Sequence, residues 1–143
     1  MKQGWWVDDA GTVKEDNVPI RETWEALEQL VDEGLAKSIG VSNFQSQLLY
    51  DLTTYARHPV SSLQIEHHPY LVQPGLIDVA QKRGVVVTAY SSFGPQSFLE
   101  LQAEFGKKAK GATTLFEDGT VKGVAEKYKV TPSQVLLRWA TQR

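Results

Sequence analysis

The run VVVTAY, residues 85–90, decides the fold of this chain. An apolar stretch of this length is typical of a strand that is buried on both faces, as in parallel sheets covered by helices. Parallel neighbours need a helical crossover between them. Helix and strand patterns should therefore alternate on either side of this run.

Two further strand patterns lie upstream. Residues 36–44 form a short strand pattern that continues into a polar turn. Residues 62–67 alternate between apolar and polar side chains, with Gln64 and Glu66 on one face. Both segments are short enough to be strands of the same sheet as residues 85–90.

Helix patterns occupy the remaining regular segments. The first begins at Pro19, because proline suits a first turn, and stops near Gly34, where a left-handed residue releases the chain. The last begins with Thr131 as N-cap and Pro132 in the first turn. Further helices are expected over 48–56, 76–82 and 120–128, and irregular segments over 1–18 and 91–117.

This alternation predicts an α/β fold with about three parallel strands and flanking helices. Polar residues stand at or just after the end of each strand pattern. In parallel sheets these carboxyl ends meet at one edge, where ligands bind. We therefore expect residues 19–143 to form helix and strand units of one domain, with its binding site at that edge.

Composition narrows the class of protein. With 15 basic and 17 acidic residues the formal net charge is −2, which argues against nucleic-acid binding but leaves room for a local anion site. The chain has no cysteine, so disulfides and thiolate metal sites are excluded and a cytoplasmic location is favoured. No apolar run approaches the ~18 residues that a membrane span needs.

Ser42 and Asn43 follow the first strand pattern. Their hydroxyl and amide groups could hydrogen-bond to an amide of a ligand. The alternative is that Asn43 only shapes the turn, as such residues often do. Gln64 and Glu66 also have two interpretations: an inward-facing pair that a ligand helps to satisfy, or an exposed polar face.

Tyr90, Ser91 and Ser92 close the third strand pattern. The tyrosine offers a flat ring for stacking, and the serines offer donors for a phosphate. Gly94, in the loop that follows, lets the backbone approach a ligand closely. Ordinary core packing is the alternative for Tyr90.

No metal site is expected. His67 and His68 are adjacent, and adjacent residues of a strand point to opposite faces, so they cannot chelate one ion. The lysines at 107, 108 and 110 form a basic cluster. A solvated loop explains this cluster, with a phosphate clamp as the alternative.

Three ordered motifs resemble those of the aldo-keto reductase family. The first is Leu27 followed, after nine residues, by KSIGVSNF at 37–44. The second is LQIEHHPY at 63–70, and the third is TAYSSFGPQSF at 88–98. The FGPQSF part is most similar to fungal xylose reductases, and the resemblance covers nearly the whole chain.

The resemblance implies a partial (β/α)8 TIM barrel from an NAD(P)H-dependent enzyme that reduces the aldehyde of a sugar to an alcohol. By motif, Ser42, Asn43 and Gln64 would hold the carboxamide of NADPH or NADH, and Tyr90 would stack on the nicotinamide ring. Ser91 and the loop after it would contact the pyrophosphate. The implied cofactor-binding residues are Ser42, Asn43, Gln64, Tyr90, Ser91, Phe93 and Gln96.

The chain also departs from the family pattern. The family's catalytic aspartate, tyrosine, lysine and histidine lie on segments before the first matched helix, and none of those motifs is found here; Tyr70 and Tyr90 belong to other motifs. The family's last barrel strand, with the segment that grips the 2′-phosphate, would begin after Arg143. The preference between NADPH and NADH is therefore open.

The length of the chain also indicates an incomplete barrel. The chain has 143 residues, whereas a full barrel takes ~250. We therefore expect an incomplete domain that is inactive alone. The alternative hypothesis is a non-catalytic interaction module, or a truncated gene product, that self-associates through the open edges of its sheet.

Overall fold

Three parallel strands form the centre of the structure, a computed structural model that describes residues 12, 16–94 and 114–142. The strands β1 (Ile39–Ser42), β2 (Val60–Glu66) and β3 (Val86–Tyr90) are hydrogen-bonded in the order β1-β2-β3. Both pairings are parallel, so the predicted α/β class is confirmed.

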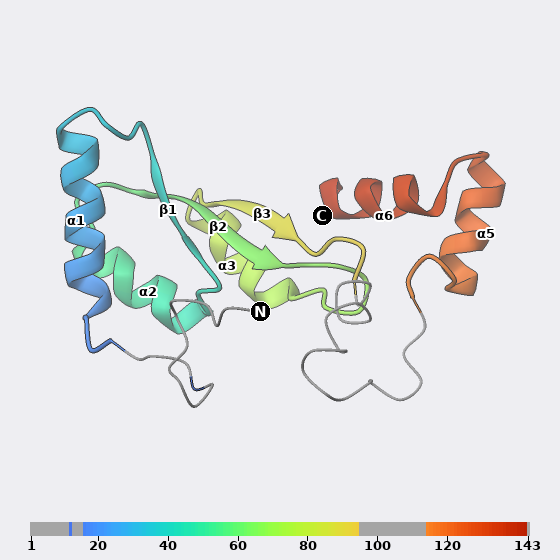
Figure 1. The fold of residues 1–143 in the computed structure, drawn as a ribbon, viewed down its shortest axis with the longest axis horizontal. Coiled ribbons are helices and arrows are strands. Elements are labelled where there is room, and N and C mark those ends of the chain that lie inside the picture. Colours follow the sequence, from blue (N-terminus) through green and yellow to red (C-terminus); the bar gives the residue numbers. More distant parts are fainter. Residues whose placement is uncertain (1–11, 13–15, 95–113, 143) are drawn as a thin grey trace.

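Five helices accompany the sheet in the described ranges. α1 (Ile20–Asp32), α2 (Ser46–Tyr55) and α3 (Pro74–Lys82) lie beside the strands, whereas α5 (Gly119–Tyr128) and α6 (Pro132–Thr141) lie beyond the end toward which the strands point (Figure 1). None of these helices combines the length and the apolar character that a membrane span requires.

Local signals at the helix ends are as the sequence predicts. α1 follows Pro19, and Gly34 adopts a φ of +72° shortly after its end. α6 begins with a capping box, in which the Thr131 hydroxyl accepts from the Gln134 amide and the Gln134 side chain accepts from the Thr131 amide. These caps satisfy orphan backbone donors and fix where the helix starts.

One face of the sheet packs against the helices and holds the core. In the parallel register Val41, Leu63 and Val87 stand in one row on this face. Leu63 is fully buried, and the other two pack against the same apolar cluster. The buried members of the cluster are Trp24, Ile39, Leu49, Leu52, Val60, Leu63, Ile65, Ile77, Ala80 and Val85.

The other face of the sheet is open, and here the prediction for β3 is wrong. The sequence of residues 85–90 predicts a strand buried on both faces, yet Val86 is 64% exposed and Thr88 is exposed as well. Both point away from the helices, and no described element covers that face. An apolar run indicates that a strand is buried in a complete fold. It cannot indicate that one face of the sheet is left uncovered in this chain.

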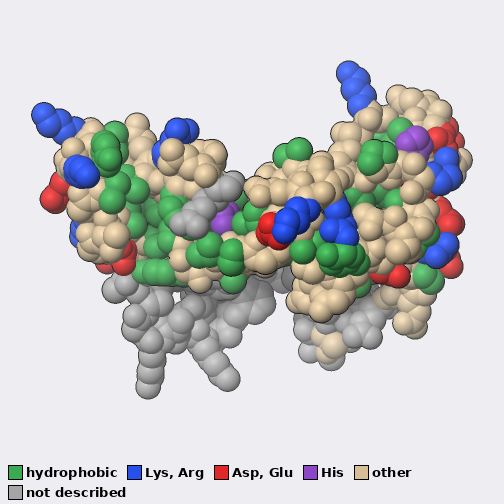
Figure 2. All heavy atoms as spheres, turned by 180° about the vertical axis from the view of Figure 1, so that it is seen from behind, with side chains coloured by type: hydrophobic (Ala, Val, Ile, Leu, Met, Phe, Trp, Pro, Cys, Tyr) green, Lys and Arg blue, Asp and Glu red, His purple; other side chains and the backbone are tan. Residues whose placement is uncertain are grey.

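A buried carboxylate joins α1 to the segment that leads into β2. Glu28 is 1% exposed and accepts hydrogen bonds from the Trp24 indole (3.0 Å) and from the backbone amides of Arg57 and His58. The Arg57 guanidinium lies 3.2 Å from Glu28 and 2.8 Å from Asp32, and His58 lies 2.7 Å from Asp32. Figure 2 shows acidic and basic side chains mixed at the end of the molecule that carries α1.

These contacts set the charge state of Glu28. Burial alone would raise the pKa of this carboxyl group, but hydrogen bonds from the His58 and Arg57 amides and the Arg57 charge lower it below its usual value. A carboxylate whose pKa is lowered in the folded state stabilises the fold above its unfolded pKa. That stabilisation is lost as the pH falls through the folded pKa.

Replacing Glu28 should therefore weaken the fold in a pH-dependent way. Glu28→Ala leaves buried donors unsatisfied, and we expect it to lower the free energy of unfolding by about 2–4 kcal/mol at neutral pH. Glu28→Gln should flatten the dependence of unfolding on pH below about pH 5. Urea unfolding at several pH values measures both effects. Glu25→Gln, on the exposed face of the same helix, is the control, and equal effects of the two glutamine variants would contradict the assignment.

Candidate functional site

The predicted polar residues gather on the open face, toward the carboxyl ends of the strands. Ser42, Gln64 and Thr88 stand in register across the sheet, and Glu66 pairs with Tyr90 one step further along. Ser42, Gln64 and Thr88 are exposed. In this chain Gln64 thus lies on an exposed polar face, whereas Glu66 is partly buried, with its Oε1 2.9 Å from His68 Nε2.

The turn after β1 is tied to the end of β2 through one carbonyl oxygen. The main-chain oxygen of Gln64 accepts from the Asn43 amide at 2.9 Å and from the Ser42 hydroxyl at 3.1 Å. Asn43 adopts a φ of +58°, in the left-handed region that asparagine tolerates better than most residues. The side chains of Ser42 and Asn43 are therefore held beside Gln64.

A side-chain hydrogen bond closes this arrangement across the sheet. The Tyr90 hydroxyl donates to Asn43 Oδ1 at 2.8 Å, so residues of β3 and of the turn after β1 meet over β2. Core packing, the alternative interpretation of Tyr90, is not what the structure shows, because Tyr90 is only half-buried and lies on the open face. The bond between Tyr90 and Asn43 was not predicted. The relevant signal in the sequence is that asparagine tolerates the left-handed region, but this does not indicate which residue its side chain contacts.

The turn after β3 brings the loop that follows it close to the α5 and α6 segment. Ser91 has a φ of +50°, and the Gly94 amide donates to the Ser91 carbonyl at 2.7 Å. A Cβ at Gly94 would lie 2.5 Å from Leu115 Cδ1, so this position needs glycine for close approach. The Phe93 ring packs against Phe116 at 5.2 Å between centroids. The Phe93 ring thus joins the turn after β3 to the segment that leads into α5.

Some predicted residues lie outside the described ranges. These are Gln96, predicted to contact a cofactor, and Lys107, Lys108 and Lys110, the basic cluster. The roles predicted for these four residues therefore stay predictions.

The two adjacent histidines take different partners. His67 stacks on Trp139 of α6 with 4.8 Å between ring centroids. His68 is buried, and its Nε2 lies 2.9 Å from Glu66 Oε1. Within residues 16–94 and 114–142, no three histidine or carboxylate side chains are grouped closely enough to hold a metal ion.

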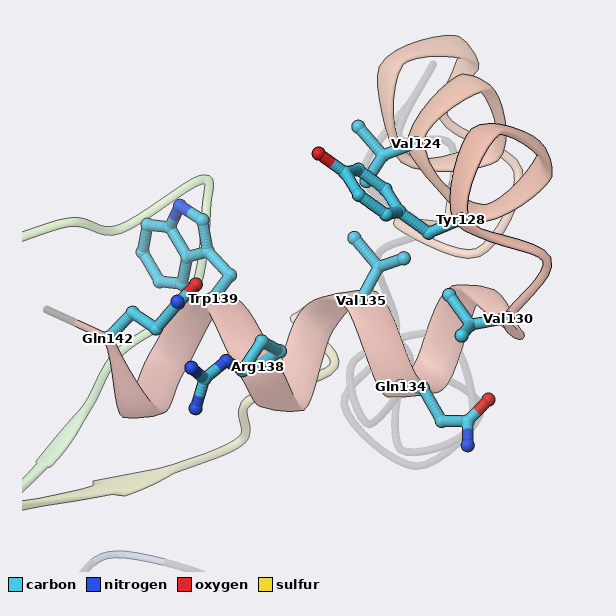
Figure 3. A pocket seen from close by; sticks show the side chains of 8 residues that line it. All are labelled: Val124, Tyr128, Val130, Gln134, Val135, Arg138, Trp139 and Gln142. Carbon is cyan, nitrogen blue, oxygen red and sulfur yellow. The ribbon is translucent and has the colours of Figure 1, made fainter.

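A separate apolar groove lies between α5 and α6 (Figure 3). Val124 and Tyr128 of α5 face Val135 of α6 across it, and Arg138 and Trp139 stand further along α6. The groove contains none of the sequence-predicted site residues. This groove and the cluster of convergent polar groups at the strand ends are thus different places.

A parallel α/β sheet with polar groups converging at its strand ends is the arrangement found in the class of (β/α) folds. Comparison with known proteins specifies it further. Residues 11–143 match the profile of the Aldo/keto reductase family, and the chain belongs to this family. The resemblance found in the three motifs is thereby confirmed.

Fungal relatives are similar over almost all of the chain. It is 59% identical over 138 residues to the probable NAD(P)H-dependent D-xylose reductase of Aspergillus flavus, which covers 96% of this chain and 42% of that protein. It is 58% identical over 141 residues to the NAD(P)H-dependent D-xylose reductase of Pyricularia oryzae, covering 98% and 43%. The chain therefore spans less than half the length of these relatives.

Solved structures agree on the fold. The aldose reductase of Schistosoma japonicum superposes with a TM-score of 0.78 at 36% identity, over 96% of this chain and 39% of that one. The aldose reductase of Giardia lamblia gives 0.77 at 36% identity, over 93% and 40%. The three-stranded sheet and its helices are thus part of a (β/α)8 barrel, as predicted.

The placement of Ser42 and Asn43 depends on a close approach of β1 to β2. A Cβ at Gly40 would lie 2.2 Å from Ser62 Oγ and 2.5 Å from the Ser62 carbonyl oxygen, beside the register irregularity between Ile39 and Gly40. A methyl group there would push the two strands apart and displace the turn that follows β1.

We therefore expect Gly40→Ala to lower the free energy of unfolding by roughly 1–3 kcal/mol. Gly123→Ala is the matched control, because nothing lies within 4 Å of a Cβ at that position in α5. It should stabilise the chain by about 0.5–1 kcal/mol through helix propensity. Thermal unfolding measures both variants. A neutral Gly40→Ala would show that β1 does not need this close contact.

Proposed function

We propose that this protein is part of an NAD(P)H-dependent reductase that converts the aldehyde of a sugar to an alcohol, and that its cofactor site is the open-face cluster. The observation that carries the proposal is the meeting of Ser42, Asn43, Gln64 and Tyr90 at the carboxyl ends of three parallel strands. The names of the fungal relatives, which specify D-xylose and NAD(P)H, support the cofactor and the substrate class.

The hydrogen-bonding groups of the cluster fit a nicotinamide carboxamide, which offers one acceptor oxygen and two N–H donors. Asn43 Oδ1 already accepts from Tyr90, so its Nδ2 group is left to donate to the carboxamide oxygen. The Ser42 hydroxyl donates to the Gln64 carbonyl and keeps its lone pairs for a carboxamide N–H. The exposed Gln64 side chain makes no hydrogen bond to any described residue, so it has both donor and acceptor to give.

The aromatic ring and the turn beyond it fit the rest of the cofactor. Tyr90 lies on the open face in line with Glu66, where its ring could stack on the nicotinamide. Ser91 and the backbone of Phe93, with Gln96 further along the loop, would contact the pyrophosphate.

When bound, the reduced nicotinamide supplies the hydride that the carbonyl carbon accepts. The residues described above bind and orient the cofactor, and none of them is placed to supply the proton that the carbonyl oxygen needs. Tyr90 is not that donor, since its hydroxyl donates to Asn43. The motifs that carry the family's proton donor are not found in these 143 residues, and we propose that the chain alone does not turn over.

A second candidate function is self-association without catalysis. β1 and β3 are the outer strands of the described sheet, and the exposed Val86 adds an apolar side chain to the β3 edge. An open edge of this kind can pair with another copy of the chain. The reductase proposal explains the convergent polar groups, which self-association leaves without a purpose.

The two candidates are separated by titrating the purified chain with NADPH in a calorimeter. We expect measurable binding that Gln64→Ala weakens roughly three- to tenfold, because one or two hydrogen bonds are lost. Gln47→Ala, an exposed glutamine of α2, should leave the affinity unchanged. With xylose added, absorbance at 340 nm should stay constant.

Three results would count against this account. Equal effects of the two glutamine variants would remove Gln64 from the site. Steady oxidation of NADPH by the chain with xylose would contradict its proposed inactivity. No NADPH binding, together with dimers in size-exclusion chromatography, would favour self-association.

A further inference from the structure

We propose that Asn43 is a positioning residue for the Tyr90 ring, in addition to its contact with the carboxamide, so that the stacking surface and the amide contact act as one unit. The inference rests on the proposed function of the open-face cluster. It starts from the 2.8 Å hydrogen bond between the Tyr90 hydroxyl and Asn43 Oδ1, which joins residues 47 positions apart in the sequence.

Both partners in this bond are anchored to the same central strand. The Asn43 amide donates to the Gln64 carbonyl at 2.9 Å, and its φ of +58° fixes the direction in which the side chain leaves the backbone. Tyr90 is in register with Glu66, and its carbonyl accepts from the His67 amide at 3.2 Å. The two side chains thus reach toward one another over β2 from fixed backbone positions.

The bond removes freedom from the ring. A half-buried tyrosine side chain at the end of an outer strand can turn about two torsions. The hydroxyl oxygen lies on the axis of the second torsion, so holding it fixes the first torsion and with it the position of the ring. The second torsion is biased through the preference of a phenol O–H for the plane of its ring. The position of the ring on which a nicotinamide would stack is therefore set before the cofactor arrives, which lowers the entropy lost on binding.

The bond also sets the orientation of the amide. Because the Tyr90 hydroxyl occupies Oδ1, the Nδ2 group of Asn43 points elsewhere and is available as a donor. Loss of the tyrosine hydroxyl would let the amide rotate, and loss of the amide would let the ring rotate. Each residue thus supports the ligand contact of the other.

An asparagine meets three requirements at this position. It tolerates the left-handed backbone, it offers an acceptor to Tyr90 and it offers a donor to the ligand. Aspartate keeps the first two and lacks the third. Glycine keeps only the first. These substitutions separate the positioning role from the ligand contact without straining the backbone.

The first measurement needs no cofactor. In the full chain with tyrosine rings labelled with ¹³C, nuclear relaxation reports how rigidly the Tyr90 ring is held. Asn43→Gly should make the ring clearly more mobile, whereas Asn43→Asp should leave it rigid. The Tyr50 ring, which packs on Arg83 of the same chain, is the internal reference. An unchanged Tyr90 ring in Asn43→Gly would overturn the inference.

The second measurement is a double-mutant cycle on NADPH affinity. Asn43→Gly and Tyr90→Phe should each weaken binding roughly three- to tenfold, and the double variant should be no weaker than about tenfold, because each single change already breaks the unit. Multiplicative effects would overturn the inference. Asn43→Asp should also weaken binding although its ring stays rigid, and Tyr50→Phe should bind like the parent chain.

The outcomes of the two measurements distinguish a failure of the proposed function from a failure of the positioning role. If the parent chain binds no NADPH, the proposed function is overturned, and the proposed action of Asn43 on a cofactor is overturned with it, whatever the ring does. A different result separates the two proposals: NADPH binds, Gln64→Ala weakens that binding, and the mobility of the Tyr90 ring is unchanged in Asn43→Gly. In that case the proposed function stands and the positioning role alone is overturned.

Discussion

The parallel pairing of β1 and β3 with β2 is the constraint on which the rest of the structure depends. It brings the carboxyl ends of three strands to one edge, although the residues there are distant in sequence. It also sorts the side chains, so that Leu63 and Ile65 pack on the helices while Gln64 and Glu66 face the open side. A shift of one residue in β2 would exchange these two sets and abolish both the core and the site.

The two faces of the sheet have different roles. The helix-facing side is closely packed around Trp24, Leu49 and Leu63, which are almost fully buried. The opposite side keeps polar groups exposed and supports the proposed cofactor contacts. In a (β/α)8 barrel this second side is the interior, and the chain spans about 42% of the length of the Aspergillus flavus relative. Rigidity on one face and accessible polar groups on the other are what a cofactor-holding surface needs.

Local features of the fold could be predicted from the sequence. Thr131 and Pro132 mark the start of the last helix because capping chemistry acts between near neighbours. The exposure of Val86 and the contacts of Glu28 could not be predicted, since they depend on which distant segments pack together. For the site, the motifs indicated the residues at the strand ends. Their mutual contact, above all the bond from Tyr90 to Asn43, arises only from the register of the folded sheet.

The central claim, that the open-face strand ends hold a nicotinamide cofactor, is tested most directly by mapping NADP⁺ on the chain with amide chemical-shift changes in NMR. The account predicts that the perturbed amides cluster at Ser42, Asn43 and Gln64 and from Tyr90 to Gly94. Residues that line the α5–α6 groove, such as Val124 and Gln134, should not respond. Perturbations confined to that groove, or spread evenly over the surface, would contradict the account.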